Sequence, residues 1–280
     1  MKEKEEEITK REKKEREEAT LTAAEQKLLS FLKKDIVVTF QTLKEVWSIK
    51  KLGSMMYLPV VIHSLVKKGY LLAIKKGTYY VTMGEPYDSI LIGQFLYKGY
   101  IGFSTALWLY GLKTEMPTVC YVVVKKGKKE KKIGQMRYKS ISLGERAVGA
   151  HYLNRYYVST RAKTIFDCLY LPKYAGGYSQ IIYAIRTASL TEQEWDEILD
   201  YLIKLGTTST LQRTGYLLSV MKEKYPDSIQ ERVLEKLLKK IKNELEKRKK
   251  TVVVLDPLFS KGGEFIKEWR IYDNVGKDKL

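Results

Sequence analysis

The amino-acid sequence predicts an α+β protein, in which an N-terminal winged helix-turn-helix domain is followed by a mixed α+β C-terminal domain. Three observations lead to this prediction. Residues 22–68 contain three short segments whose apolar residues recur at helical spacing. Two β-prone runs around a glycine-containing turn follow these segments directly. Beyond residue 84, strand-like and helix-like segments are mixed and do not alternate as βαβ units, which favours α+β over α/β.

The three N-terminal helices have recognisable start and stop signals. Thr22-Ala23-Ala24-Glu25 is a capping box that opens the first helix, and the second covers about residues 40–47. The third, about residues 56–68, has Pro59 in its first turn, where a missing N–H costs little, and Gly69 after its end. The apolar residues expected to face the core are Leu28, Leu29, Leu32, Leu43, Val46, Trp47, Val61, Ile62, Leu65 and Val66.

The two β-prone runs, residues 70–74 and 79–81, are expected to form the wing, and double-stranded DNA is therefore the predicted partner. Residues 19–82 hold ten lysines, three acidic residues and no arginine, a formal charge of +7. Lysine neutralises phosphates as a point charge, whereas arginine is the commonest reader of guanine. Base reading should then depend on apolar and hydroxyl contacts or on DNA shape. The residues expected to contact DNA are Lys50, Lys51, Ser54, Met55, Tyr57, His63, Ser64, Lys67, Lys68, Lys75 and Lys76.

The winged helix has alternative roles, as a protein-binding module or as a structural remnant.

The turn-rich sequence Met83-Gly84-Glu85-Pro86 marks the predicted boundary, which gives domains of residues 21–83 and 84–280. Residues 1–20 are expected to be a charged flexible tail or a solvated helix, since residues 1–18 carry seven basic and eight acidic residues. The chain as a whole carries +18, which favours an anionic partner such as a nucleic acid or a membrane surface. Without a run of 18 apolar residues or a signal peptide, we expect a cytoplasmic protein and no membrane partner.

In the C-terminal domain, a β-branched strand is expected at residues 119–124 and a return strand near 136–141. The turn between them holds Lys125, Lys126, Lys128, Lys129, Lys131 and Lys132. These lysines either form a second contact with phosphates or belong to a solvated loop that protects a sheet edge. Helices are expected near residues 87–96, 104–110, 162–170, 191–206 and 227–249, and further strands near 156–158 and 251–255.

No group of residues in the sequence indicates catalysis. Cys120 and Cys168 lack metal-ligand spacing and are expected to be buried thiols. A nuclease-like set can be assembled from Asp88, Glu130 and Lys132, but Glu130 lies in the lysine-rich turn, where such spacing arises by chance. The Gly-Gly pair at 176–177 lacks the Gly-Lys-Ser/Thr ending of a phosphate-binding loop. We therefore expect no catalytic residue, no metal site and no cofactor.

Three ordered blocks carry a resemblance to a known family. They are Tyr100–Leu107 with Gly111-Leu112; Val158–Leu169 with Pro172 and Gly176-Gly177; and Arg213–Leu218 with Leu255-Asp256-Pro257, Gly262-Gly263 and Trp269–Asn274. With the winged helix in front of them, the chain resembles the abortive-infection antitoxin family (AbiEi-like) over about residues 21–275. The chain departs from the family pattern at Ala162, where the family usually has Glu, and at Thr214, where it has Leu. The motif residues, interpreted as fold-defining, are Lys163, Thr164, Asp167, Gly176, Gly177, Arg213 and Gly215.

The resemblance implies a bifunctional regulator. Its winged helix would bind operator DNA upstream of its own operon, and its C-terminal domain would counter a nucleotidyltransferase-like toxin in antiviral defence. A stable complex with the toxin is not implied. Two other readings stay open: a stand-alone transcription factor whose C-terminal domain dimerises or senses a ligand, and a nucleic-acid-processing enzyme with a winged-helix targeting module.

Overall fold

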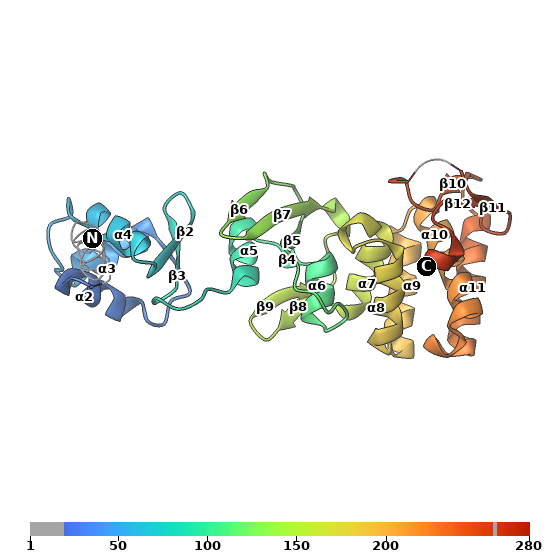
Figure 1. Cartoon of the computed structure of the whole chain (residues 1–280), viewed down its shortest axis with the longest axis horizontal. Coiled ribbons are helices and arrows are strands. Elements are labelled where there is room, and N and C mark those ends of the chain that lie inside the picture. The colour runs from blue at the N-terminus through green and yellow to red at the C-terminus, as the bar shows by residue number, and fades with distance from the viewer. Residues whose placement is uncertain (1–19, 260–261) are drawn as a thin grey trace, which may run out of the picture. The chain divides into compact units, whose positions relative to one another are not determined.

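The protein is an α+β structure, as the sequence predicts (Figure 1). The computed structural model describes residues 20–259 and 262–280. Contacts divide the chain into two compact units, and the division lies between Leu96 and Tyr97. The predicted boundary at residue 83 lies earlier in the chain, because helix α5 (Ser89–Tyr97) comes almost wholly before the division. Of the charged segment predicted over residues 1–20, all but Thr20 lies outside the described residues.

In the N-terminal unit, three helices precede a β-hairpin, which is the order that the sequence predicts. A short strand that the sequence did not predict, β1, pairs antiparallel with β3 and gives the sheet order β1-β3-β2. Thr22 opens the first helix with a capping box, as predicted. The elements are α2 (Ala23–Leu32), β1 (Val37–Thr39), α3 (Phe40–Ile49), α4 (Leu58–Lys67), β2 (Leu71–Lys75) and β3 (Thr78–Val81).

The core of this unit lies between the three helices and the sheet. Completely buried side chains are Leu28, Leu32, Leu43, Trp47, Leu58 and Leu65. Val46 and Val66, which were expected in the core, are only partly buried at its border. Each fully buried leucine contributes about 1.5–3 kcal/mol of transfer free energy. One face of α4 is therefore committed to the stability of the unit, and only its other face is available for further contacts.

The C-terminal unit is built on a six-stranded mixed sheet with the order β6-β7-β5-β4-β9-β8. Its central strands are the most apolar, because both of their faces are covered, and Val122 and Ile101 are completely buried. The strands are β4 (Tyr100–Ile101), β5 (Val119–Val124), β6 (Lys131–Ile133), β7 (Met136–Ser142), β8 (Ala150–Leu153) and β9 (Tyr156–Ser159).

The sequence prediction was wrong about the connection between residues 124 and 136. We expected a hairpin with a basic turn, but β5 and β7 run parallel, from the pair Val119 and Arg137 to the pair Val124 and Ser142. The chain first returns along the edge strand β6, and a tight turn at Gly134, with φ of 56°, reverses it into β7. A second turn thus restores the original strand direction, and the lysines occupy the crossover and the edge strand.

Helices and a small sheet complete the C-terminal unit. The helices are α6 (Phe103–Leu109), α7 (Arg161–Tyr170), α8 (Tyr178–Ala188), α9 (Glu192–Leu205), α10 (Thr208–Lys224) and α11 (Glu231–Glu246), and the small sheet consists of β10 (Val253–Val254), β12 (Ile271–Asp273) and β11 (Glu264–Ile266). The capping box at Thr191 opens α9 as predicted. The predicted helix 227–249 is shorter at both ends, since Pro226–Ser228 forms a 3-10 turn. The spacing of apolar residues did not predict α10, because this helix is buried on most of its circumference and has no single apolar face.

Gly215 allows α10 to approach the last part of the chain closely. A Cβ at this position would collide with the Trp269 ring, which is 1% exposed. The Trp269 indole N–H donates a hydrogen bond to the Ser219 hydroxyl one turn further along α10, at 3.0 Å. A residue with a side chain would have to displace this ring, so glycine is needed here for packing.

Candidate nucleic-acid interface

The turn between α3 and α4 is held by the side chain of Trp47. Its indole N–H donates to the carbonyl oxygens of Gly53, at 3.0 Å, and Ser54, at 3.3 Å. Trp47 is completely buried, and a Cβ on Gly53 would lie 3.3 Å from the ring. Gly53 has φ of 149°, a conformation that residues with a side chain rarely adopt. The position of the turn, and with it the start of α4, is therefore determined by a buried aromatic residue of α3.

One side of α4 and of the turn before it is exposed. Met56, Pro59, Val60, His63 and Lys67 are spaced by three or four residues, so they lie on one face. This face is largely apolar, with Met56 88% and Val60 55% exposed. Exposed apolar side chains gathered on one small surface commonly mark a binding site. We call these five residues the α4 outer face.

Most of the residues predicted to contact DNA lie at the surface of the N-terminal unit. Met55 is 38% and Tyr57 48% exposed. Sequence reasoning missed Met56 and Val60, although Val60 lies three residues before His63 and seven before Lys67, which places it on the same helical face. The other exposed members of the predicted set are Lys50, Lys51, Ser54, His63, Lys67 and Lys76, and Lys75 is half-buried.

Lys68 and Ser64 differ from this set, because both face α2. The Lys68 ammonium is 2.8 Å from the Glu25 carboxylate and donates a second hydrogen bond to the Thr20 carbonyl oxygen at 2.9 Å. Glu25 is 2% exposed, and Ser64 also hydrogen-bonds to it. The sequence signal for Lys68 was its charge alone, whereas its partner lies 43 residues away. We therefore treat Lys68 and Ser64 as residues that join α4 to α2.

The hydrogen bonds to Glu25 change its acidity. Burial acts to raise the pKa of this carboxyl group, but hydrogen bonds from Lys68, Ser64 and the Thr22 backbone outweigh burial and hold the pKa below its ordinary value. The folded state thus favours the charged carboxylate. The same group completes the capping box of α2, since the Thr22 N–H donates to it at 2.7 Å.

The β2–β3 hairpin carries Lys75 and Lys76 at its turn. Gly77 occupies this turn with φ of 64°, and its carbonyl oxygen accepts a hydrogen bond from the Phe40 N–H at 2.8 Å. The turn is thereby attached to the first residue of α3. Lys76 is exposed beside it, and Lys50, at the end of α3, lies with its ammonium 5.0 Å from the centre of the Phe31 ring.

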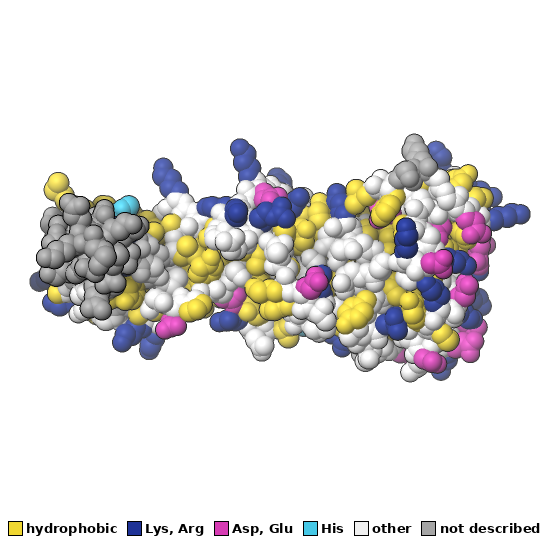
Figure 2. Space-filling view, in the orientation of Figure 1, with side chains coloured by type: hydrophobic (Ala, Val, Ile, Leu, Met, Phe, Trp, Pro, Cys, Tyr) yellow, Lys and Arg dark blue, Asp and Glu magenta, His cyan; other side chains and the backbone are white. Residues whose placement is uncertain are grey.

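The second basic segment, residues 125–132, lies in the C-terminal unit. Lys125, Lys126, Lys128, Lys129 and Lys132 are exposed, and Figure 2 shows basic side chains gathered over β6 and β7. Glu130 forms exposed ion pairs with Arg137 and Lys139 of β7, at 4.0 and 3.8 Å. The segment borders the edge strand β6, and charged side chains on an edge oppose pairing with other strands. This placement fits both roles expected from the sequence, a contact with phosphates and the protection of a sheet edge.

The motif residues of the family resemblance meet in the core of the C-terminal unit. Lys163 and Asp167 form an ion pair on successive turns of α7, and both are completely buried. The Tyr100 hydroxyl donates to Asp167 at 3.2 Å, and the Lys163 ammonium donates to Tyr100 at 3.1 Å. The rings of Tyr100, Phe166 and Tyr201 lie 5.2–5.8 Å from the ammonium. The first and second blocks of the resemblance are therefore joined by one buried polar cluster.

Burial opposes both charges of this pair. It raises the pKa of Asp167, although the Lys163 ammonium and the Tyr100 hydroxyl act to lower it. Burial likewise lowers the pKa of Lys163, against the effect of Asp167. Neither group reaches solvent, so we assign the pair a structural role. Thr164, also buried, exchanges a 2.7 Å hydrogen bond with the Ser159 hydroxyl at the end of β9.

The remaining motif residues position backbone segments. Gly176 and Gly177 have φ of 103° and 90°, and Gly177 caps α8. The Arg213 guanidinium donates twice to the Val254 carbonyl oxygen, at 3.0 and 3.1 Å, which attaches β10 to α10. Ala162, where the family usually has Glu, is 1% exposed.

Two residues of the alternative nuclease-like set, Asp88 and Glu130, are engaged in contacts within the structure. Asp88 accepts hydrogen bonds from the backbone of Ile90 and Leu91, both at 3.0 Å, and so caps α5. Among residues 20–259 and 262–280, no group of three or more His, Cys, Asp or Glu side chains could hold a metal ion. The Cys120 and Cys168 thiols are completely buried, and burial raises the pKa of Cys168.

The whole chain has a structural neighbour. It is similar to the crystal structure of the RV2827C protein from Mycobacterium tuberculosis, with a TM-score of 0.58 and 16% sequence identity. The similarity covers 90% of this chain and 92% of that protein, so the two share a fold across nearly their full lengths. No family model matches the sequence, and no curated protein matches it. Within the described part of the chain, no helix is long and apolar enough to cross a membrane.

The ion pair between Glu25 and Lys68 predicts an acid-dependent stability of the N-terminal unit. Because the pKa of Glu25 is lowered in the folded state, its contribution is present above its unfolded pKa and is lost as pH falls through the folded pKa. Glu25→Gln should cost about 1–3 kcal/mol at neutral pH. The cost should shrink as pH falls through the lowered folded pKa of Glu25, where the wild-type carboxylate becomes protonated too. Urea unfolding at a series of pH values measures this.

The matched control is Asp35→Asn, which removes an exposed carboxylate of the same unit. It should change stability by less than about 0.5 kcal/mol. An equal loss in both variants, or a loss in Glu25→Gln that does not depend on pH, would contradict the role assigned to Glu25.

Proposed function

We propose that the protein is a sequence-specific DNA-binding transcriptional regulator whose N-terminal unit is a winged helix-turn-helix. In this proposal α4 is the recognition helix in the major groove, and the β2–β3 hairpin is the wing beside it. The single observation that carries the proposal is the division of α4 into two faces. One face is buried in the core, while the α4 outer face is exposed and includes Lys67 at the end of the helix.

Electrostatics supports a nucleic-acid partner for this surface. Lys50 and Lys51 follow α3, Lys67 lies at the end of α4, and Lys76 lies in the wing turn. Phosphate contacts made by such lysines would supply affinity without base preference. The three carboxylates of residues 19–82 leave this charge in excess, and Glu25 is already paired with Lys68. Membrane association has weaker support, because the exposed apolar residues form a small face on a short helix.

The first prediction concerns salt dependence. Each of Lys51→Gln and Lys76→Gln should weaken binding to all DNA sequences alike and reduce the slope of log K against log salt by about 1. Fluorescence anisotropy of the intact protein on DNA from its own upstream region, at about 50 to 200 mM salt, measures the affinity and the slope. Footprinting on the same DNA locates the binding site. Lys27→Gln, an exposed position of α2 on the same unit, is the charge-matched control. An unchanged slope in both wing and turn variants would refute this interface.

The second prediction concerns base discrimination. The α4 outer face has no arginine, so we expect its apolar side chains to contact thymine methyl groups. Val60→Ala should lower the ratio of specific to nonspecific affinity roughly fivefold, since two buried methyl groups are lost from the interface. Nonspecific affinity should stay constant, because phosphate contacts are untouched. Competition binding with operator and scrambled duplexes tests this, and an equal loss on both duplexes would contradict it.

We further propose that the protein acts as an antitoxin against a nucleotidyltransferase-like toxin, in line with its resemblance to the AbiEi-like family. What favours this reading is that the resembling blocks contact each other. Tyr100 of the first block bonds to Lys163 and Asp167 of the second, and within the third block Gly215 packs against Trp269.

Co-expression tests this role. The intact protein should restore the growth of cells that express a toxin of this class encoded next to it, and the isolated N-terminal residues 20–96 should not. Absence of an adjacent toxin gene together with absence of rescue would remove the antitoxin role. DNA binding would survive that result, since it depends on the other unit.

A further inference from the structure

Part of the six-stranded sheet in the C-terminal unit is open to solvent and has no role in the function proposed above. On one face of this sheet, Val123 of β5 and Ile141 of β7 are buried in the same core as Phe103 of α6. Tyr121 and Lys139 lie two residues earlier in these strands, so they are on the same face, and they are paired in register. Tyr121 is only half-buried, and Lys139 is 42% exposed. The helices therefore cover the later part of β5 and β7 and leave the earlier part open.

Two tyrosines lie at the centre of this open area. Tyr174 is the last residue of a 3-10 turn, Pro172–Tyr174, and the centre of its ring is 5.3 Å from that of Tyr121. Phe103 packs edge to face with both rings, at centre distances of 6.2 Å to Tyr121 and 5.2 Å to Tyr174. Phe103 is completely buried, whereas both tyrosines are half-buried. The two phenol rings are thus held from the core side and remain accessible to solvent.

A cavity of about 230 Å³ opens beside the tyrosines. Both phenol rings contribute to its lining, together with Ser104, Lys113, Thr118 and Lys173. A planar group that enters this cavity would therefore lie next to the phenol rings and to lysine side chains.

Cations surround the tyrosines. The ammonium groups of Lys173 and Lys139 lie 4.9 and 5.8 Å from the centre of the Tyr174 ring. Arg137, 56% exposed, lies two residues before Lys139 on the same face of β7. Lys132 of β6 is paired with Arg137 in register and is also exposed. We call these four cations and the two tyrosines the open sheet surface.

Two carboxylates lie near the open sheet surface, and neither cancels its charge. Glu130 is 43% exposed and lies 4.0 Å from Arg137 and 3.8 Å from Lys139, so water screens both ion pairs. Glu115 is 86% exposed and pairs with a lysine of the cavity at 3.9 Å. Residues 125–139 hold eight basic residues and one acidic residue. This excess of positive charge, visible over β6 and β7 in Figure 2, favours a polyanionic partner.

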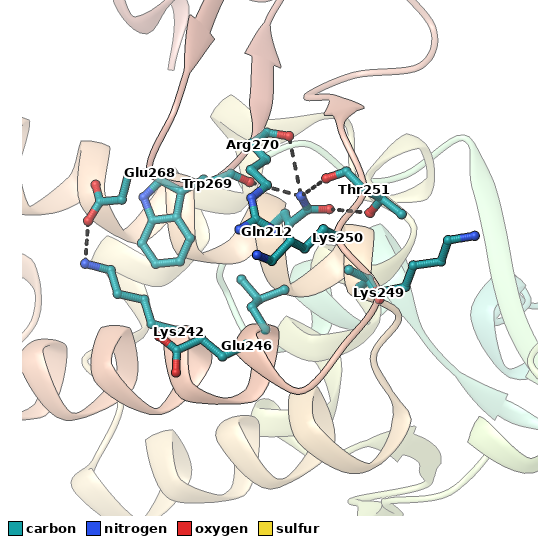
Figure 3. Close-up of a pocket in the computed structure, with 11 residues that line it drawn as sticks. Gln212, Lys242, Glu246, Lys249, Lys250, Thr251, Glu268, Trp269 and Arg270 are labelled. Atoms are coloured by element: carbon teal, nitrogen blue, oxygen red, sulfur yellow. Dashed lines mark hydrogen bonds and ion pairs between the residues drawn. The ribbon is translucent and has the colours of Figure 1, made fainter.

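A larger cavity, of about 460 Å³ and bordered by α10 and α11, differs from this surface. Figure 3 shows that polar side chains of its lining bind within the protein. The Gln212 amide donates to the Thr251 carbonyl oxygen at 2.8 Å, and Lys242 forms an ion pair with Glu268. The Trp269 ring in its wall is 1% exposed. That ring is used for packing, whereas the tyrosines of the open sheet surface are accessible to a partner.

Aromatic rings set among cations bind nucleic acid through two kinds of contact, because bases stack on the rings while phosphates bind the cations. In duplex DNA the bases stack on one another, so their faces are not accessible to a protein ring. We propose that the open sheet surface binds single-stranded nucleic acid. A base lies against Tyr121 and Tyr174. The phosphates bind Arg137, Lys139 and Lys173. This activity does not rest on the winged helix, because the surface lies in the other unit.

Fluorescence anisotropy of the intact protein tests the proposal with labelled oligo(U) RNA and oligo(dT) DNA of about 12 nucleotides, and with a duplex from its own upstream region. At least one single strand should bind saturably, and the preferred strand identifies the ligand as RNA or DNA. Tyr174→Leu should weaken this binding roughly tenfold, because one stacked base is lost. Tyr174→Phe keeps the ring and should bind as the wild type does. Neither variant should change the affinity for the duplex.

The cations provide a second, independent measurement. Arg137→Gln and Lys173→Gln should each weaken single-strand binding roughly threefold and reduce its salt slope by about 0.7. Lys240→Gln, at an exposed position of α11, is the charge-matched control. Lys76→Gln in the β2–β3 turn should weaken binding to the duplex alone. Failure of the winged helix is therefore distinguishable from failure of this surface.

The cation variants test the surface even where Tyr174→Leu disturbs the fold, because Arg137 and Lys173 are exposed. The proposal is overturned if neither single strand binds saturably, if Tyr174→Phe loses as much affinity as Tyr174→Leu, or if Lys240→Gln loses as much as Arg137→Gln. It is also overturned if the cation variants weaken duplex binding as much as single-strand binding, because the surface would then be a second contact for duplex DNA.

Discussion

The C-terminal unit depends on a buried ion pair. Lys163 and Asp167 are both completely removed from water, and each charge would be costly without the other. Tyr100 supplies the remaining hydrogen bonds from the start of β4, so the cluster is satisfied only when α7 is seated against the sheet in one position. A hydrophobic contact would tolerate small shifts of the helix, whereas this cluster does not. The pair therefore contributes to the uniqueness of the packing. Because both side chains are completely buried, no ligand can reach them.

Lysine has three different roles in this chain, and burial separates them. Lys163 is completely buried and structural, and Lys68 is mostly buried and links α4 to α2 through Glu25. Lys51, Lys76 and Lys250 are exposed, with their charges available to a partner. A formal charge of +18 describes all of these residues alike. Only the exposed lysines can add to the attraction of a polyanion, so the relevant quantity is the charge left over at each surface after internal pairing.

Local signals in the sequence were sufficient for much of the fold. The α+β class, the capping boxes at Thr22 and Thr191 and the strand at residues 119–124 depend on neighbours within a few residues, and the structure contains all of them. Features that depend on distant partners were missed. The parallel pairing of β5 with β7 results from an extra edge strand and the turn at Gly134, and α10 is too fully buried to show an amphipathic period.

The candidate interface was predictable to a similar extent. Charge and position on α4 correctly indicated surface residues such as His63 and Lys67, but charge alone could not reveal that Lys68 is bound to a carboxylate 43 residues away. Val60 was overlooked because an apolar residue on a helix is ordinarily assigned to the core. A helix that fills a core on one side and contacts a partner on the other carries apolar residues on both faces. Hydrophobicity therefore does not distinguish the two faces of α4. The orientation of the helix distinguishes them, and this orientation is set by the contacts of Trp47 with the turn before α4 and of Glu25 with Lys68 at its end.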